Sequence, residues 1–257
     1  MDNIVKRNIG CATIWGGIQN ADFDIAAHSL SASLYSRSCA GGKGGDIYYF
    51  SVCGKDKLTR IAVADVVGHG EDVSEISAWV YESLVKRMSN LEGNGVLSEL
   101  NDKLQGRGLE AMTTAAVVAF YTGNHHLYFS YAGHPPLFVK RRYESSWSPI
   151  ELKTTPGMNN LPLGIKRETY YDQNETPLEK GDRVFLYTDG VIEAPDADHN
   201  LYGKDRLLAL LNSMENAAIH EIKNAVLADL LRHTSGSLEH DDVTMLVLEV
   251  NGSEHNS

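Results

Sequence analysis

Residues 44–70 read GGDIYYFSVCGKDKLTRIAVADVVGHG and hold two apolar runs separated by a short polar turn. The runs IYYFSVC and LTRIAVAD are rich in β-branched and aromatic residues, which is typical of strands. Residues 54–57 (GKDK) are turn formers of the kind that join two strands. The stretch therefore predicts a β-hairpin whose second strand ends on a carboxylate at a glycine-rich turn.

The length of the turn sets which residues face each other across this hairpin. If residues 54–57 close it, Cys53 lies opposite Leu58. Counting back along both strands then places Asp46 opposite Asp65. The two-residue alternation of a strand puts three further pairs on the face of these carboxylates, namely Tyr48/Val63, Phe50/Ile61 and Val52/Thr59. Like charges directly opposite destabilise a sheet, so the Asp46/Asp65 pair requires a cation or a proton between them.

The rest of the chain alternates between groups of strands and pairs of helices. Strands are expected around Val5–Trp15 and Ala32–Ser38, and over residues 113–122, 126–140 (broken at 133–136), 182–188 and 243–250. Apolar residues three to four apart predict helices over residues 71–90, 96–105, 204–212 and 216–233. The polar segment with Asn20, Asp22 and Asp24 and residues 141–160 are expected to be loops. This order favours an α+β fold with a two-sheet sandwich and outer helices over a parallel βαβ sheet.

Composition bounds the class of protein. The 257 residues carry a formal net charge of −11, which argues against a nucleic-acid or anionic-membrane binder. No apolar run approaches the ~18 residues that span a bilayer, and the N-terminus lacks the apolar stretch of a secretory signal. Cys11, Cys39 and Cys53 lack CxxC spacing, so neither a disulfide framework nor a zinc site is expected. The chain is expected to be soluble and cytoplasmic.

Four aspartates share one kind of position in the sequence. Asp46, Asp65, Asp189 and Asp241 each stand at the end of an expected strand, beside a glycine or a second acid. A strand-end aspartate on its own is commonly a turn former or a helix cap. Four carboxylates without a matching set of His or Cys ligands suit a hard cation such as Mg²⁺ or Mn²⁺. Two such ions ~3.5–4 Å apart can activate water and polarise a phosphoryl oxygen.

Six motifs carry a resemblance to a known family. They are GGD (44–46), DVVGHG (65–70), AGHPP (132–136), LPLGI (161–165), GDRVFLYTDGVIEA (181–194) and DDVTMLVL (241–248). In this order they resemble the metal-dependent protein phosphatases of the PPM (type 2C-like) superfamily, in the bacterial SpoIIE/RsbU branch. The resemblance implies one phosphatase domain over residues 1–257 with a four-layer αββα sandwich. Its motif-bearing core would cover about 32–250, with an additional N-terminal strand in 1–31 and a frayed tail at 251–257.

The resemblance also implies a binuclear Mn²⁺ or Mg²⁺ centre that hydrolyses phosphoserine or phosphothreonine. Asp46, Asp65, Asp189 and Asp241 match the metal-binding aspartates, with Asp65 bridging the two ions. The backbone carbonyl of Val66 would be a further ligand. A hydroxide between the two ions would attack phosphorus, so no Ser or Cys nucleophile is needed. The residues Asp242, Gly190 and His69 would surround and orient these ligands.

The chain departs from the family pattern at several positions. Tyr49 stands where many relatives have a second Asp after GGD, and Val67 stands where type 2C relatives have a histidine thought to be the general acid. The general acid is therefore unassigned. His69 is open to two interpretations, a chemical role or the shaping of the strand-to-helix turn. His134 is interpreted as a structural turn residue, with titration near neutrality as the alternative. Residues 71–72 (Glu-Asp) replace the small residues that usually follow GHG.

Three functional hypotheses follow from these observations. The first is a phosphoserine/phosphothreonine phosphatase whose substrate is a phosphorylated anti-sigma-factor antagonist of the STAS type. The second is a non-catalytic module that binds a phosphoprotein, and the third is a two-metal hydrolase of small phosphoesters. Trp79 lies off the apolar stripe of the helix expected at 71–90. It is either an aromatic at the edge of the core or a contact of a homodimer formed through this helix.

Overall fold

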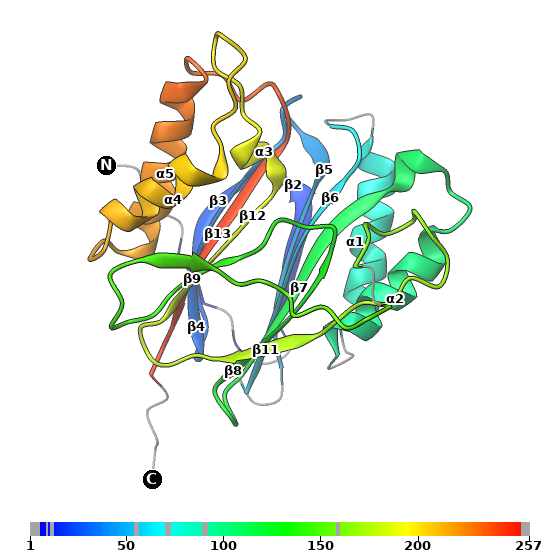
Figure 1. Ribbon diagram of the computed structural model, residues 1–257, viewed down its shortest axis with the longest axis horizontal. Coiled ribbons are helices and arrows are strands. Elements are labelled where there is room, and N and C mark those ends of the chain that lie inside the picture. Colours follow the sequence, from blue (N-terminus) through cyan, green and yellow to red (C-terminus); the bar gives the residue numbers. More distant parts are fainter. Residues whose placement is uncertain are drawn as a thin grey trace.

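The computed structural model describes residues 6–8, 10, 13–53, 57–69, 73–88, 92–157 and 160–252. Within these ranges the strands form two sheets that pack face to face (Figure 1). Neighbouring strands run antiparallel except for the parallel pair β1 and β3. The first sheet has the order β1 (Lys6–Asn8), β3 (Ala21–Ala26), β4 (Leu30–Arg37), β13 (Val243–Val250), β12 (Arg183–Tyr187), β9 (Phe138–Lys140) and β10 (Trp147–Pro149). The second has the order β11 (Asn174–Pro177), β8 (His126–Ala132), β7 (Thr113–Tyr121), β6 (Leu58–Val66), β5 (Lys43–Cys53) and β2 (Ile14–Gln19).

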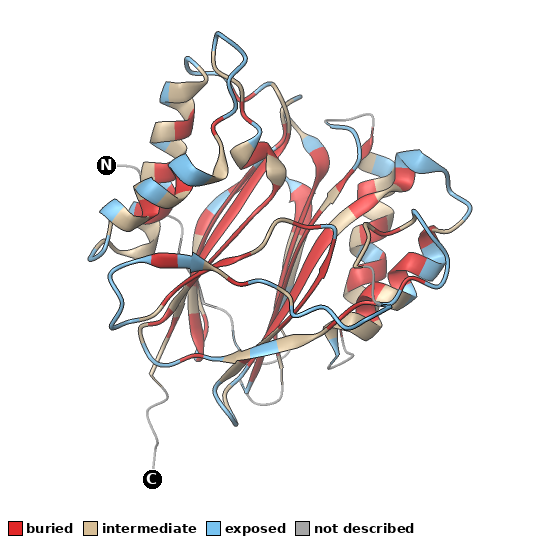
Figure 2. Ribbon diagram, in the orientation of Figure 1, coloured by how far each residue is buried: buried red, intermediate tan, exposed pale blue. Residues whose placement is uncertain are grey.

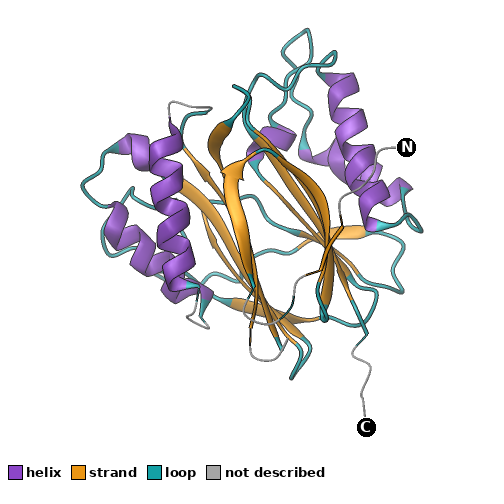
Figure 3. Ribbon diagram, turned by 180° about the vertical axis from the view of Figure 1, so that it is seen from behind, coloured by secondary structure: helices purple, strands orange, loops and turns teal. Residues whose placement is uncertain are grey.

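Helices cover the outer face of each sheet (Figures 1 and 3). The helices α1 (Ser74–Arg87) and α2 (Gly93–Leu104) pack on the six-stranded sheet, and α4 (Lys204–Ser213) and α5 (Ile219–His233) pack on the seven-stranded sheet. The short helix α3 (Asp189–Ile192) follows β12, and a 3₁₀ turn, Leu109–Ala111, precedes β7. The expected α+β fold with four αββα layers is confirmed. None of the helices in the described ranges is long and apolar enough to cross a membrane.

Three apolar cores hold the four layers together (Figure 2). The central core joins the inner faces of both sheets through residues such as Phe50, Ile61 and Leu246. On the outer face of the six-stranded sheet, Tyr49 packs in one cluster with Val80 of α1. The seven-stranded sheet packs in the same way on α4 and α5. Successive residues of a strand point to opposite faces of its sheet. In β5, every second residue therefore faces the other sheet, and the residues between them face the helices.

The hairpin of β5 and β6 has the register that its turn length predicts. Cys53 pairs with Leu58, and Asp46 pairs with Asp65. The three intervening pairs on the same face are also as expected, namely Tyr48/Val63, Phe50/Ile61 and Val52/Thr59. Residues 54–56 of the turn lie outside the described residues. The two carboxylates therefore face each other at one end of an otherwise apolar ladder.

The N-terminal part of the chain differs from its prediction. One strand was expected around Val5–Trp15, but the range holds β1 (Lys6–Asn8) and the start of β2 at Ile14, which belong to different sheets. Residues 5, 9, 11 and 12 of this range lie outside the described residues. The polar segment that was expected to be a loop is largely the strand β3. In it Asp22 and Asp24 alternate with buried apolar residues, so the segment is a half-buried strand with an unusually acidic outer side. The loop prediction was wrong because strands rarely carry aspartate at this density.

Residues 141–160 also differ from the loop that was expected there. The short strand β10 lies within them and pairs with β9, and the indole of Trp147 is only 2% exposed. The break expected at residues 133–136 is real, but β8 and β9 on either side of it belong to different sheets. The short elements β11 and α3 were not expected as separate elements. Residues 253–257 of the expected frayed tail lie outside the described residues.

Candidate metal centre

The four strand-end aspartates lie at one end of the sandwich. Asp46 and Asp65 face each other in the β5–β6 hairpin. Asp189 is the first residue of α3, directly after β12, and Asp241 precedes β13, the antiparallel neighbour of β12. A hydrogen bond joins the two sheets here, because the Thr188 hydroxyl donates to Asp46 Oδ2 at 2.8 Å. Figure 1 shows the ends of β5 and β6 beside α3.

Two glycines permit the close approach of the segments that carry these aspartates. A Cβ atom on Gly45 would stand 2.8 Å from the carbonyl oxygen of Val66 and 3.0 Å from that of Gly68. A Cβ atom on Gly190 would overlap the backbone carbonyl oxygen of Asp242. The glycines of GGD and TDG are therefore needed because other backbone segments occupy the space of a side chain. The first contact also places the Val66 carbonyl beside the aspartate pair.

Asp242 connects three segments around the aspartates. Its carboxylate accepts hydrogen bonds from the backbone N–H groups of Cys39, at 2.8 Å, and Gly45. Its own N–H donates to Asp241 Oδ1 at 2.8 Å. Asp242 is buried, and both of its oxygens are used in these contacts. Its position supports the expected orienting role, since it fixes Asp241 and the GGD turn relative to each other.

Thr188 contacts the aspartate cluster, and the motif analysis missed it. Besides donating to Asp46, its hydroxyl accepts a hydrogen bond from the Thr244 backbone N–H at 3.0 Å. It thereby holds the Asp46 carboxylate against the end of the β12–β13 pair. The signal was available in the sequence, because Thr188 directly precedes Asp189 in the TDG motif. Only the cross-sheet partner could not be predicted.

The aspartates lie in a strongly unfavourable environment for negative charge. Asp46 is 3% exposed, and within the described residues its Oδ1 accepts no hydrogen bond. Burial raises the pKa of Asp46, and the charges of Asp242 and Asp241 raise it further. Burial, together with Asp46, Asp189 and Asp241, raises the pKa of Asp65 to about 10. Burial likewise raises the pKa of Asp189, and that of Asp241 to about 6. Without cations, Asp65 therefore keeps its proton at neutral pH.

The donor set fits hard divalent cations. Several carboxylates, one with an unsatisfied buried oxygen, lie close to the backbone carbonyl of Val66. Oxygen ligands of this kind are those that Mg²⁺ and Mn²⁺ prefer. In the described part of the chain, no three His, Cys, Asp or Glu side chains are already arranged around one ion position. Ligation therefore requires the carboxylates to rotate about their side-chain torsions.

Tyr49 and Val67, which replace family residues, do not line the centre as ligands. Tyr49 lies on the face of β5 opposite to that of Asp46 and packs in the core beneath α1 and α2. The side chain of Val67 is exposed, and its backbone N–H donates to the Met112 carbonyl at 2.8 Å. Residues 71 and 72 lie outside the described residues. The departures from the family pattern therefore leave the four aspartates as the charged core of the centre.

The two histidines of the motifs have different surroundings. His69 is exposed, its Nδ1 lies 3.4 Å from Cys39 Sγ, and its charge lowers the pKa of Asp241. His134 is buried and donates from Nδ1 to the Pro135 carbonyl at 2.9 Å. Burial lowers the pKa of His134 to about 4, so it is neutral at physiological pH. These contacts agree with the structural interpretation of His134, whereas His69 lies at the rim of the centre.

AGHPP and LPLGI form a frame beside the centre rather than part of it. The Gly133 N–H donates to the Asn160 carbonyl at 2.7 Å, and Thr113 forms a bridge with Leu163. The next residue on β7, Thr114, pairs with Asp65. These two motifs therefore stabilise the strand that flanks Asp65.

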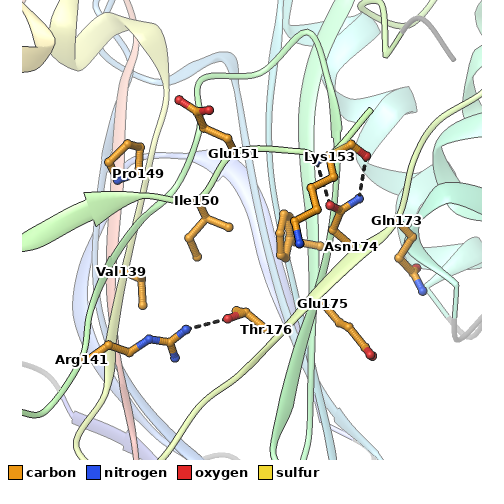
Figure 4. A pocket seen from close by; sticks show the side chains of 11 residues that line it. Val139, Arg141, Pro149, Ile150, Glu151, Lys153, Gln173, Asn174, Glu175 and Thr176 are labelled. Carbon is orange, nitrogen blue, oxygen red and sulfur yellow. Dashed lines mark hydrogen bonds between the residues drawn. The ribbon is translucent and has the colours of Figure 1, made fainter. Parts of the chain in front are cut away.

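A cavity of about 630 Å³ opens elsewhere, between the edges of the two sheets (Figure 4). Residues of β8 to β11 and of the segment between β10 and β11 line it, with an apolar floor that includes Phe129 and Ile150. Hydrogen bonds from Arg141 to Thr176 and between Lys153 and Asn174 cross its rim. None of the four aspartates lines it, so this cavity is not part of the candidate metal centre.

Comparison with known proteins identifies related sequences. The family model described as Stage II sporulation protein E (SpoIIE) matches residues 55–251. This range includes Asp65, Asp189 and Asp241 but not Asp46. Phosphoserine phosphatase RsbU of Bacillus subtilis (strain 168) is 31% identical over 238 residues, which cover 90% of this chain and 64% of RsbU. Stage II sporulation protein E of Priestia megaterium is 22% identical over 262 residues, with 100% and 42% covered. The chain thus spans less than two thirds of the length of these relatives.

Solved structures share the fold. The RsbU and RsbW domains of a Mycobacterium tuberculosis protein align with a TM-score of 0.74 and 22% identity, over 91% of this chain and 61% of that one. The PP2C phosphatase domain of SpoIIE from Bacillus subtilis, solved with a fragment of its regulatory domain, aligns with a TM-score of 0.71 and 22% identity. That alignment covers 86% of this chain and 63% of the SpoIIE structure. At this level of identity, the likeness establishes the αββα architecture alone.

Proposed function

The chain belongs to the Stage II sporulation protein E family, and from this premise we propose that it is a metal-dependent protein phosphatase. Its reaction would be the hydrolysis of phosphoserine or phosphothreonine. The observation that carries the proposal is the pairing of Asp46 with Asp65 at a buried end of the ladder, where Asp189 and Asp241 join them. Cations would neutralise the charge of so many buried carboxylates. Divalent cations held by carboxylates can also activate water and polarise a phosphoryl group.

We assign the four aspartates and the Val66 carbonyl as ligands of two Mn²⁺ or Mg²⁺ ions, with Asp65 between them. When bound, the two ions would activate a water molecule for attack on phosphorus and would place positive charge next to the phosphoryl group. Asp242 holds Asp241 and the GGD turn in place, and Thr188 holds Asp46. Neither a Ser nor a Cys nucleophile is needed. In agreement, burial and the charge of Asp242 raise the pKa of the Cys39 thiol to about 11, far from that of a nucleophilic thiolate.

The proposed substrate is a phosphorylated signalling protein, specifically an anti-sigma-factor antagonist of the STAS type. The similarity to RsbU, whose name describes a phosphoserine phosphatase, supports a phosphoserine-containing substrate. The formal net charge of −11 gives the chain no general attraction for nucleic acids, which favours a protein substrate over a polynucleotide. A small phosphoester remains the competing substrate class that an experiment has to separate.

The test compares three substrates at equal concentration in the presence of Mn²⁺. We expect phosphate release from a phosphoserine-bearing STAS protein to exceed release from a nucleoside monophosphate or p-nitrophenyl phosphate by at least about a hundredfold in kcat/KM. Chelation with EDTA should abolish all three rates. Preference for the nucleotide would contradict the protein-phosphatase assignment. Binding of the phosphoprotein without any phosphate release would instead indicate a non-catalytic module.

A further inference from the structure

Cys39 and His69 form a pair at the rim of the aspartate cluster that the proposed reaction does not use. Cys39 follows β4 of one sheet and His69 follows β6 of the other, yet Cys39 Sγ lies 3.4 Å from His69 Nδ1. Cys39 is partly buried and His69 is exposed, so ions in solution can reach both atoms. The structure thus places a thiol and an imidazole together beside a group of carboxylates.

The separation of these two atoms matches that of two ligands on one zinc ion. With Zn–S of about 2.3 Å and Zn–N of about 2.0–2.1 Å, a tetrahedral angle puts the ligand atoms about 3.6 Å apart. The observed 3.4 Å is close enough that no backbone movement is required. Cys39 is also anchored, because its backbone N–H donates to the buried Asp242 carboxylate at 2.8 Å.

Asp241 is a candidate for a third ligand, because it adjoins Asp242, whose carboxylate accepts the hydrogen bond from the Cys39 backbone N–H at 2.8 Å. Thiolate and imidazole select zinc over magnesium or manganese, whereas the aspartates prefer the hard ions. We propose that Cys39 and His69 bind a soft divalent cation such as Zn²⁺, with Asp241 completing the site. Since Asp241 also belongs to the proposed phosphatase centre, the bound ion withdraws this carboxylate and inhibits hydrolysis.

Two features of the structure set the cost of this site. Binding must displace the thiol proton of Cys39, and this costs more than at an ordinary cysteine because burial and Asp242 raise the pKa of that thiol to about 11. The Asp241 side chain must also turn, because no three such side chains in the described residues already surround one ion position. The site is therefore one that forms when the cation is present.

The binding test uses Co²⁺ as a spectroscopic substitute for zinc and does not depend on the proposed function. Titration of the metal-free full chain should produce a thiolate-to-cobalt charge-transfer band, which one equivalent of Zn²⁺ removes. Cys39→Ala should abolish this band. The matched control is Cys53→Ala, because Cys53 is also partly buried but its sulfur accepts a hydrogen bond from the cationic Arg60 at 3.1 Å. A band that persists in Cys39→Ala, or is lost in Cys53→Ala, overturns the assignment.

The inhibition test rests on the proposed phosphatase activity. In Mn²⁺-activated phosphate release, Cys39→Ala and His69→Gln should each raise the Zn²⁺ concentration for half-inhibition at least about tenfold. Cys39→Ala keeps the backbone N–H that binds Asp242, so its rate without Zn²⁺ should equal that of the parent. An unchanged Zn²⁺ sensitivity would show that zinc inhibits by replacing Mn²⁺ at the aspartates, which contradicts the inhibitory role of the Cys39/His69 site. An inactive parent would refute the proposed function and leave the cobalt result as it stands.

Discussion

At the scale of single residues, the buried carboxylates are the costliest feature of the structure. Asp46 and Asp65 face each other across a ladder whose other pairs are largely apolar. Neither can ionise freely without a cation, because burial and the neighbouring charges both favour the protonated form. We therefore expect these groups to lower the free energy of unfolding of the metal-free protein.

The first prediction concerns the pH dependence of stability without divalent cations. Folding raises the pKa of Asp65 to about 10 and that of Asp241 to about 6, both from the ordinary aspartate pKa of 3.8. Above about pH 4 the unfolded chain has lost both protons, whereas the folded protein keeps that of Asp241 up to about pH 6 and that of Asp65 up to about pH 10. The free energy of unfolding therefore falls as the pH rises through this range. In urea titrations with EDTA, the protein should be less stable at pH 8 than at pH 5.

Asp65→Asn supplies the control for this prediction, because an amide has no proton to lose in this range. The slope of the free energy of unfolding against pH should be shallower in Asp65→Asn than in the parent. Equal or greater stability of the parent at pH 8 than at pH 5 would contradict the electrostatic account.

Residue contacts were predictable where one turn determines them. The Asp46–Asp65 pairing follows from counting back from residues 54–57, because a hairpin has one register for a given turn. The Thr188–Asp46 and Cys39–His69 contacts join different sheets. No local pattern in the sequence contains the relative position of two sheets, so these contacts could be found only in the structure.

At the scale of elements, the short helix α3 must lie almost in contact with the segment that precedes β13. Gly190 of α3 has no room for a side chain, because the Asp242 carbonyl occupies the position of its Cβ atom. The same carbonyl belongs to the segment that carries Asp241. The close packing of these two backbone segments therefore also determines where Asp189 and Asp241 lie.

The second prediction is that Gly190→Ala destabilises the protein. The added methyl group forces α3 away from the Asp242 segment, with an expected loss of about 1–3 kcal/mol in the free energy of unfolding. Urea unfolding measures this loss. Gly10→Ala is the control, because Gly10 is exposed and no heavy atom of the described residues lies within 4 Å of the position of its Cβ atom. Equal unfolding midpoints for Gly190→Ala and the parent would refute the packing argument.

The third prediction concerns Trp79 of α1. The indole packs at the edge of the core under α1 and α2, and the Arg107 guanidinium lies 3.9 Å from the centre of its ring. Trp79→Ala should cost about 1–3 kcal/mol of stability through lost burial and the lost cation–π contact. The homodimer through the helix at 71–90 stays a prediction. We expect light scattering to give the same mass for Trp79→Ala as for the parent, whereas a halved mass would place Trp79 in a dimer interface.

Long elements were predictable and short ones were not. The helices α1, α2, α4 and α5 follow from apolar spacing, because each buries one continuous stripe against a sheet. The strand β3 was missed because its outward residues Asp22 and Asp24 mimic a loop. The strand β10 is only three residues long. Its Trp147 is buried because it packs in the core beneath α4 and α5, and no local sequence pattern indicates this contact. In such segments tertiary packing outweighs local preference.

At the scale of the whole molecule, the sandwich brings the ends of two antiparallel strand pairs together at one end of the fold. The β5–β6 pair contributes Asp46 and Asp65, and the β12–β13 pair contributes Asp189 and Asp241. The two pairs belong to different sheets, so the centre exists only when the sheets pack face to face. The order of strands and helices predicts the four layers. The passage of β8 into β9 from one sheet to the other was not predictable, because the break at residues 133–136 does not show its direction.

The measurement that tests the central claim most directly is the Mn²⁺-dependent rate of phosphate release from a phosphoserine protein by Asp189→Asn. Removal of one ligand carboxylate should lower the rate at least about a hundredfold at saturating substrate and fixed Mn²⁺. Asp198→Asn, at an exposed aspartate after α3, is the matched control and should keep the parental rate. A rate for Asp189→Asn within twofold of the parent would contradict the assignment of the four aspartates as the metal centre.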